Sequence, residues 1–271
     1  MMLGEVRHRL DQNPIYDWVM RCPVVAFSLL ILSRDVHAFS QQALHDRIIL
    51  EQLDIGLLAA TLARISQWMF VLLLSIQPLF RLRPIAKSED MLPRIAALMA
   101  VGIPLTFMLL DRAPADVAFN LTSVVLSLFA NVACLVTAGF LGRSLSVMPE
   151  ARRLVRAGPY ATVRHPLYLF EILGIGAVAL QYRSLPAAGL LLVAAGLQVA
   201  RARWEEAVLD RAFDDFGTYR AETSFLVPAK PLRFFASFAK DVVARRLLAT
   251  VVAVMLFMLA LIAATLPKLR V

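Results

Sequence analysis

Two stretches of the sequence place polar and aromatic residues at spacings that could perform chemistry. The first contains Gly158-Pro159-Tyr160 and then Arg164-His165-Pro166-Leu167-Tyr168. A proline at the first position of a helix costs no hydrogen bond, so Pro166 predicts that a helix begins directly after His165. The first backbone N–H groups of a helix have no partner within it and can receive an anionic group such as a carboxylate.

The second stretch begins at Arg201 and continues through Glu205-Glu206, Leu209 and a series of spaced aromatic residues to Val227-Pro228. On a helix, Arg201 and Glu205 are four residues apart and share one face. Opposite charges placed in this way could hold the two ends of a zwitterionic ligand, or could form a surface ion pair that contributes little.

Composition sets the environment in which these residues work. Hydrophobic residues make up 59% of the 271 positions and the mean hydropathy is +0.69, above the roughly 45–50% of soluble domains. The net charge of +8 is spread between apolar runs, which favours membrane loops over nucleic-acid binding. Cys22 and Cys134 have no metal-ligand or disulfide spacing, so we expect small buried hydrophobes and no metal site.

The apolar runs predict an all-α polytopic transmembrane bundle of about six or seven spans. A charged N-terminus with no small-residue cleavage site argues against a removed signal peptide. The run at residues 17–33 is short and interrupted by Arg21 and Pro23, so it could span the bilayer or lie at its surface. The predicted spans are approximately 17–33, 55–80, 94–111, 116–141, 166–182, 185–200 and 247–266.

Basic residues predict how the bundle is oriented. Loops 81–94, 143–164 and 201–246 carry 18 Lys and Arg residues if placed on one side, against six on the other. The positive-inside rule therefore puts these three loops in the cytoplasm. Spans 166–182 and 185–200 should form a tight helical hairpin that returns to the same side. Arg64 and Asn131, which lie within spans, are candidates for function or for helix interfaces.

The two motif blocks together resemble the isoprenylcysteine carboxyl methyltransferase family and its relatives, the phospholipid methyltransferases. That pattern is Gly-x-Tyr followed by Arg-His-Pro-x-Tyr, a helical hairpin, and then Glu-Glu-x-x-Leu with spaced aromatics and a Val-Pro ending. Here the later elements are Leu209, Phe213, Phe216, Tyr219 and Val227-Pro228. The resemblance covers roughly residues 140–230, and two blocks in the right order are more specific than either alone.

The resemblance implies an S-adenosylmethionine-dependent methyltransferase with a cytoplasmic cofactor pocket and a lipid or prenylated-cysteine-type acceptor, with methylation of a carboxylate favoured. Arg201 would face the acceptor as the catalytic residue and could orient a carboxylate with two hydrogen bonds. Residues implied to bind the cofactor are Leu154, Val155, Tyr160, His165, Pro166, Leu167, Tyr168 and Glu205. Glu206 would point elsewhere on the helix.

The resemblance also implies a division of the chain. Residues 1–140 would form an N-terminal membrane region, 141–230 the catalytic core, and 231–271 an extension with an additional span. The protein would be a multi-pass membrane protein, in the inner or plasma membrane if bacterial, with its site facing the cytoplasm. Its partners would be the bilayer and the acceptor, with no nucleic acid.

The sequence departs from the family pattern at several positions, and the first of these bears on the identity of the substrate. Phe170 and Glu171 stand where a glycine often follows the block, and Glu222 stands where some members have a tyrosine. Two other classes remain open: an NADPH-dependent sterol- or steroid-type reductase, and a non-catalytic scaffold in which both blocks are interfacial anchors. The Arg-His-Pro block followed by Glu-Glu favours methyl transfer.

Overall fold

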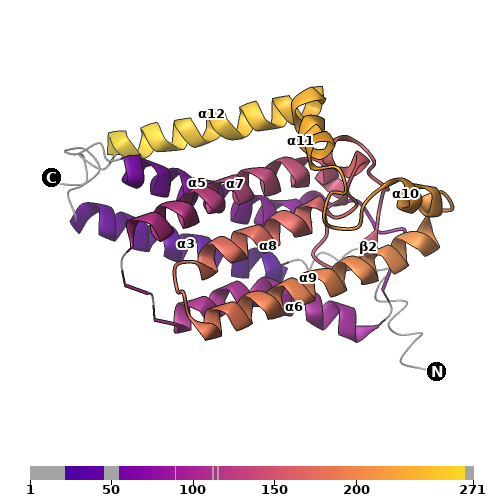
Figure 1. Ribbon diagram of the computed structural model, residues 1–271, viewed down its shortest axis with the longest axis horizontal. Coiled ribbons are helices and arrows are strands. Elements are labelled where there is room, and N and C mark those ends of the chain that lie inside the picture. Colours follow the sequence, from indigo (N-terminus) through magenta and orange to yellow (C-terminus); the bar gives the residue numbers. More distant parts are fainter. Residues whose placement is uncertain (1–21, 46–54, 89, 112, 115, 266–271) are drawn as a thin grey trace.

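The apolar runs of the sequence form a bundle of long helices in the computed structural model, which describes residues 22–45, 55–88, 90–111, 113–114 and 116–265 (Figure 1). The all-α prediction is confirmed. The helices are α3 (Cys22–His45), α5 (Ile55–Phe80), α6 (Met91–Thr106), α7 (Val117–Leu141), α8 (Pro166–Ala179), α9 (Leu185–Ala212), α10 (Phe216–Glu222), α11 (Pro231–Lys240) and α12 (Val242–Thr265). Short 3-10 turns lie at η1 (Phe107–Leu109), η2 (Gly142–Ser144) and η3 (Gly158–Ala161), and two strands at β1 (Ala86–Lys87) and β2 (Glu150–Ala151).

Four helices within the described residues are long and apolar enough to cross a membrane. They are Gly56–Gln77, Val117–Ser144, Leu185–Ala212 and Val242–Ile262. Two predicted spans form shorter apolar helices, α6 and α8, of 16 and 14 residues. At 1.5 Å per residue these are about 24 and 21 Å long, less than the roughly 30 Å of a bilayer core. The chain is therefore a multi-pass membrane protein in which α6 and α8 pack against longer helices.

The structure describes only part of the run at 17–33, which the sequence left open as a span or as a segment at the bilayer surface. Residues 17–21 lie outside the described part of the chain, and α3 runs from Cys22 to His45. It is not among the four helices that meet the length and hydropathy test within the described residues, and it carries Arg34 and Asp35 near its middle. Asp35 accepts a hydrogen bond from the indole N–H of Trp68 on α5 at 2.6 Å. This polar contact ties α3 to the bundle.

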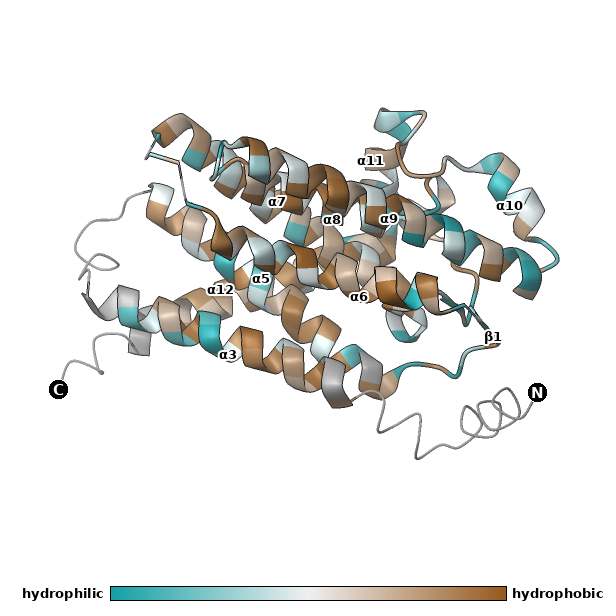
Figure 2. Ribbon diagram, turned by 90° about the horizontal axis from the view of Figure 1, so that it is seen from below, coloured by the Kyte–Doolittle hydropathy of each residue, from teal (hydrophilic) through white to brown (hydrophobic). Residues whose placement is uncertain are grey.

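The three basic loops meet at one end of the bundle, as the charge pattern predicts. Strand β1 of the first loop pairs antiparallel with β2 of the second. Val163 forms a parallel bridge with Ser224, which joins the second loop to the third. Figure 2 shows hydrophilic residues gathered at this end, around α10 and the end of α9, while the long helices are mostly hydrophobic. Residues distant in sequence are thus brought together at a single polar end.

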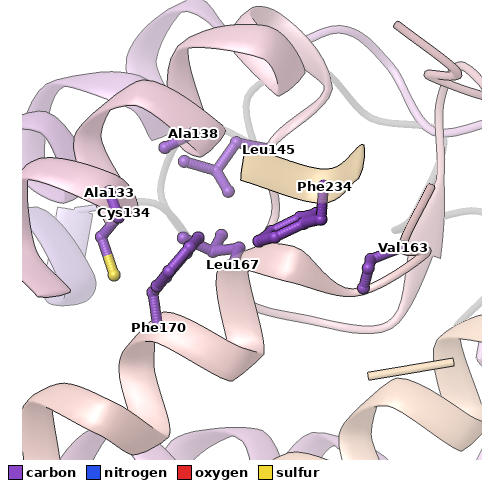
Figure 3. Close-up of a cluster of buried hydrophobic side chains, with 8 residues drawn as sticks. All are labelled: Ala133, Cys134, Ala138, Leu145, Val163, Leu167, Phe170 and Phe234. Carbon is purple, nitrogen blue, oxygen red and sulfur yellow. The ribbon is translucent and has the colours of Figure 1, made fainter. Parts of the chain in front are cut away.

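A buried apolar cluster at the same end fixes the start of α8. Phe234 of α11 is fully buried and packs with Leu167, Phe170 and Val163 (Figure 3). The rings of Phe170 and Phe234 are stacked, with centroids 6.1 Å apart. Ala133, Cys134 and Ala138 of α7 and Leu145 complete the cluster. Helix α11 therefore holds α8 in place from outside the hairpin.

Polar residues predicted within spans have neighbours in the bundle. The amide of Asn131 donates to the hydroxyl of Ser66 at 3.2 Å, which joins α7 to α5. The guanidinium of Arg64 lies 5.2 Å from the ring centroid of Phe39. Both contacts fit a role at helix interfaces. Cys134 is buried as expected, but Cys22 is exposed, because it lies at the first position of α3 rather than inside a buried span.

Candidate functional site

The start of α8 holds His165 in one position. His165 is the N-cap residue and Pro166 occupies the first turn, as the sequence predicts. The His165 side chain is 4% exposed; its ring stacks on that of Tyr168 with centroids 5.5 Å apart. Its Nε2 lies 3.2 Å from Oε1 of Glu206. The backbone N–H of His165 donates to the carbonyl of Phe225 at 3.1 Å. These contacts fix both the helix start and the imidazole.

Glu206 binds the residue before His165 as well. Arg164 Nε donates to Glu206 Oε1 at 2.5 Å, and the side chains are 9% and 15% exposed. Arg164 Nη1 also donates to the carbonyls of Arg220 and Thr223. Sequence reasoning placed Glu206 outside the site without a role. The structure makes it the residue that joins α9 to the Arg-His pair, and the adjacency of two glutamates opposite Arg164-His165 was the available signal.

A glycine shapes the turn that precedes the block. Gly158 has φ +57°, a region that favours glycine. A Cβ atom at this position would lie 2.3 Å from the ring of Phe140 on α7. The Gly-Pro turn therefore packs directly on α7 and places Tyr160 next to Tyr219 of α10.

A polar cavity of about 60 Å³ lies between segment 144–155, the start of α8 and α9. Seven of the eight predicted cofactor residues line this cavity; Pro166 is buried and does not. The seven are Leu154, Val155, Tyr160, His165, Leu167, Tyr168 and Glu205. Arg152, Arg153, Arg164, Phe216 and Tyr219 add cationic and aromatic groups to its walls. His165 and Glu205, from blocks 40 residues apart, thus share one cavity.

Two tyrosines supply hydroxyl groups that stay protonated. Burial, reinforced by the negative charge of Glu205, raises the pKa of Tyr160 well above its usual value. Burial also raises the pKa of Tyr219, whose hydroxyl donates to the carbonyl of Tyr160 at 2.7 Å. The Tyr160 hydroxyl is buried and has no hydrogen-bond partner within the described residues. Because a buried polar group without a partner costs free energy, this hydroxyl fits a position for a ligand.

A larger cavity of about 810 Å³ adjoins the polar one. Residues of α3, α5, α6, α8 and α9 line it, and most are apolar, including Phe70, Leu98, Phe107 and Ile175. Four basic side chains, Arg81, Lys87, Arg94 and Arg201, line it as well. The two cavities share five lining residues: Leu145, Ser146, Glu150, Leu167 and Tyr168. A polar ligand and an apolar ligand could therefore meet at this junction.

Tyr168 contacts residues of both cavities, through its hydroxyl on one side and the face of its ring on the other. Its hydroxyl donates to Glu205 Oε2 at 2.7 Å in the polar cavity. The guanidinium of Arg201, which lines the large cavity, lies 4.8 Å from the Tyr168 ring centroid. Arg201 and Glu205 therefore serve different cavities, with Tyr168 contacting both.

Arg201 is held by neighbours that the sequence did not indicate. Its Nη1 donates to Gln198 Oε1 at 2.6 Å, and its Nη2 donates to the carbonyl of Val147 at 3.1 Å. Glu171 Oε2 lies 3.7 Å from Nη1 and accepts a hydrogen bond from Gln198 Nε2 at 2.7 Å. Glu171, flagged as a departure from the family pattern, thus lies in the large cavity, while Phe170 belongs to the apolar cluster of Figure 3.

A second acidic residue at the junction, Glu150, is hydrogen-bonded to residues of its own loop. Glu150 on β2 accepts hydrogen bonds from Arg152 Nη2 at 2.5 Å and from the Ser146 hydroxyl at 3.0 Å. Arg152 Nε in turn donates to the carbonyl of Leu82 at 2.7 Å. These bonds join the loop after α5 to the loop after α7. Within the described residues, no group of three or more His, Cys, Asp or Glu side chains could hold a metal ion.

A helical membrane protein with adjoining polar and apolar cavities is the class that the fold and site define. The family model described as phospholipid methyltransferase matches residues 116–215. This segment runs from α7 to the residue before α10, and it contains the first motif block and the second block as far as Phe213. For this segment of the chain, the match confirms the resemblance to the phospholipid methyltransferases that was drawn from those blocks.

Two curated relatives match a similar length of chain. The nickel-cobalt-cadmium resistance protein NccN of Alcaligenes xylosoxydans xylosoxydans is 31% identical over 108 residues, covering 35% of this chain and 51% of that protein. The cobalt-zinc-cadmium resistance protein CzcN of Cupriavidus metallidurans is 33% identical over 106 residues, covering 35% of this chain and 49% of that protein. The chain thus spans about half the length of the curated relatives it matches.

Proposed function

We propose that the protein is a membrane methyltransferase that uses S-adenosylmethionine to methylate a lipid-embedded acceptor. The observation that carries this proposal is the junction at Tyr168, where a polar cavity with an acidic wall adjoins a large apolar cavity. A water-soluble donor and a lipid-phase acceptor need such a junction in order to react. The family of residues 116–215 supports methyl transfer as the reaction.

The residues of the polar cavity fit this donor. The Glu205 carboxylate can pair with the amino group of the donor, and the start of α8 can receive its carboxylate. Faces of Tyr160, Tyr168 and Phe216 can attract the sulfonium. The unpartnered Tyr160 hydroxyl supplies a further donor group. Since the cavity encloses only about 60 Å³, a nucleoside-sized ligand would also extend beyond it.

When bound, the cofactor supplies an activated methyl group. The chain's own residues would then work mainly by alignment and by exclusion of water, because an in-line displacement needs little covalent help. Arg201 and Glu171 contact the large cavity beside Tyr168 and would orient the acceptor there. The many apolar residues of the other walls suit an acyl or isoprenoid chain.

The proposed acceptors are a membrane lipid or a prenylated molecule, and the proposed orientation puts the basic end of the bundle in the cytoplasm. That end holds the loops with 18 basic residues and the polar cavity, so a cytoplasmic donor would reach its site directly.

Binding and transfer experiments test this function. Purified protein in detergent should bind S-adenosylmethionine and not NADPH in isothermal titration calorimetry. Membranes containing the protein should transfer label from methyl-labelled S-adenosylmethionine into lipid or polypeptide, and membranes without it should not. Preferential binding of NADPH would instead favour the reductase reading, and the absence of both binding and transfer would favour a scaffold.

A further inference from the structure

The large cavity holds a carboxylate close to the junction. Glu171 lies on α8, three residues after Tyr168, and so on the same face of the helix. Its side chain is 17% exposed, whereas that of its partner Arg201 is 5% exposed. Both residues line the large cavity. The more accessible charge at this point is therefore the negative one.

Arg201 is already engaged on several sides. Gln198 bridges it to Glu171 through bonds of 2.6 and 2.7 Å, and Val147 accepts from Nη2. The remaining nitrogen, Nε, is buried without a hydrogen-bond partner among the described residues. A carboxylate that approached Arg201 from the large cavity would meet the negative charge of Glu171, which lies 3.7 Å from Nη1. The arrangement therefore disfavours a carboxylate acceptor.

The neighbours of Glu171 leave its carboxylate able to take up a proton. The charged and titratable groups that face it are Arg201 and Glu205 on α9, Tyr168 on α8 and Cys134 on α7. The other acid of the cavity, Glu150, is bound to Arg152 and Ser146. Of the acids that line the large cavity in the described part of the chain, Glu171 is the one whose contacts do not include a direct charged hydrogen bond.

Resting on the proposed function, we infer that the acceptor is a protic group, an amine or hydroxyl, and that Glu171 takes its proton. In this step the bond between the methyl carbon and sulfur breaks, and sulfur keeps the electron pair. A lone pair of the acceptor nitrogen or oxygen forms the new bond to carbon, while the N–H or O–H proton moves to a Glu171 oxygen. The proton then leaves to water with product release. A carboxylate acceptor has no proton to lose and would need no such residue.

The kind of product formed separates the two acceptor classes. Protein in nanodiscs of polar lipids from its expression host receives tritium-methyl S-adenosylmethionine, and N-acetyl-S-farnesylcysteine serves as a carboxylate probe. Alkali releases methanol from methyl esters but leaves methylamines and methyl ethers intact. We expect alkali-stable label in the nanodisc lipid and no volatile label from the farnesylcysteine. Volatile methanol as the main labelled product would overturn the inference.

Variants of Glu171 test its role as proton acceptor. E171Q keeps the size of the side chain, so its affinity for S-adenosylmethionine should stay within about twofold, while turnover should fall at least about 100-fold. Turnover in E171Q should then rise with pH, by about tenfold per unit, because the acceptor must lose its proton unaided. E171D should retain part of the activity. The exposed residue Glu222 provides a matched control, E222Q, which should behave as wild type.

Each other outcome has a distinct meaning. If E171Q lost activity to the same extent at every pH, Glu171 would only hold Arg201, and the inference would fail. It would also fail if E171Q and E222Q were equally active. If no label were transferred and S-adenosylmethionine did not bind, the proposed function itself would fail. If the donor bound and volatile ester label appeared, the function would stand and the protic acceptor would not.

Discussion

Replacing Glu205 with glutamine probes the donor pocket directly, because the change removes a charge and almost no volume. The Glu205 carboxylate lines the polar cavity and accepts a hydrogen bond from Tyr168 at 2.7 Å. The amide oxygen of glutamine can keep that bond, so the fold should not change. What is lost is the charge-assisted bond to the donor's amino group, worth about 1.5–3 kcal/mol.

This loss of binding free energy corresponds to a roughly 10- to 150-fold larger dissociation constant for S-adenosylmethionine. Isothermal titration calorimetry of E205Q against wild type measures it. The neighbouring change E206Q is a matched control, because Glu206 contacts Arg164 and His165 and does not line the cavity.

E206Q should mainly lower the thermal unfolding temperature. Loss of the Glu206 charge leaves the Arg164 side chain, which is 9% exposed, without a negative partner. This costs about 1–3 kcal/mol of stability or more. E205Q should leave the unfolding temperature near that of wild type. Unchanged donor affinity in E205Q, or equal losses of affinity in both variants, would refute the assignment of Glu205 to the donor.

Three further substitutions separate the two cavities from the supporting structure. R201A should abolish detectable transfer while leaving donor affinity within about twofold, because Arg201 lines only the large cavity; measurable turnover on the true acceptor would contradict this. Y168F removes the hydroxyl bound to Glu205 and should weaken donor binding about fivefold, for a loss of about 1 kcal/mol; an unchanged dissociation constant would show that the bond does not position Glu205. F234A empties the apolar cluster that fixes α8 and should destabilise the fold by about 3–5 kcal/mol, which thermal unfolding in detergent measures; an unaltered unfolding temperature would mean that α11 does not support the site.

Helix positions followed from local pattern where the apolar runs were long and uninterrupted. The predicted 55–80 coincides with α5, and 116–141 differs from α7 by one residue. The predicted span 185–200 and the helix predicted around Arg201 and Glu205 form one continuous helix, α9, which ends at Ala212. A search for apolar runs ends a span where charged residues begin. Arg, Glu and Ala nevertheless all favour helix, so the chain continues as a helix beyond the apolar run. Helix α11 was missed because its apolar face is short.

The sequence by itself determined the helical membrane class and the helix start at Pro166, and the family resemblance of its motifs named seven of the residues that line the polar cavity. These depend on hydrophobic run length, on the backbone restriction of proline and on motif spacing, which are local properties of the chain. Only the tertiary structure decided the partner of each charge. The i, i+4 spacing of Arg201 and Glu205 suggested a shared role, but packing of α8 against α9 gave Glu171 and Gln198 to Arg201 and Tyr168 to Glu205. Partners across helices depend on rotation and depth in the bundle, which the packing of many side chains sets together and which no short stretch of sequence encodes.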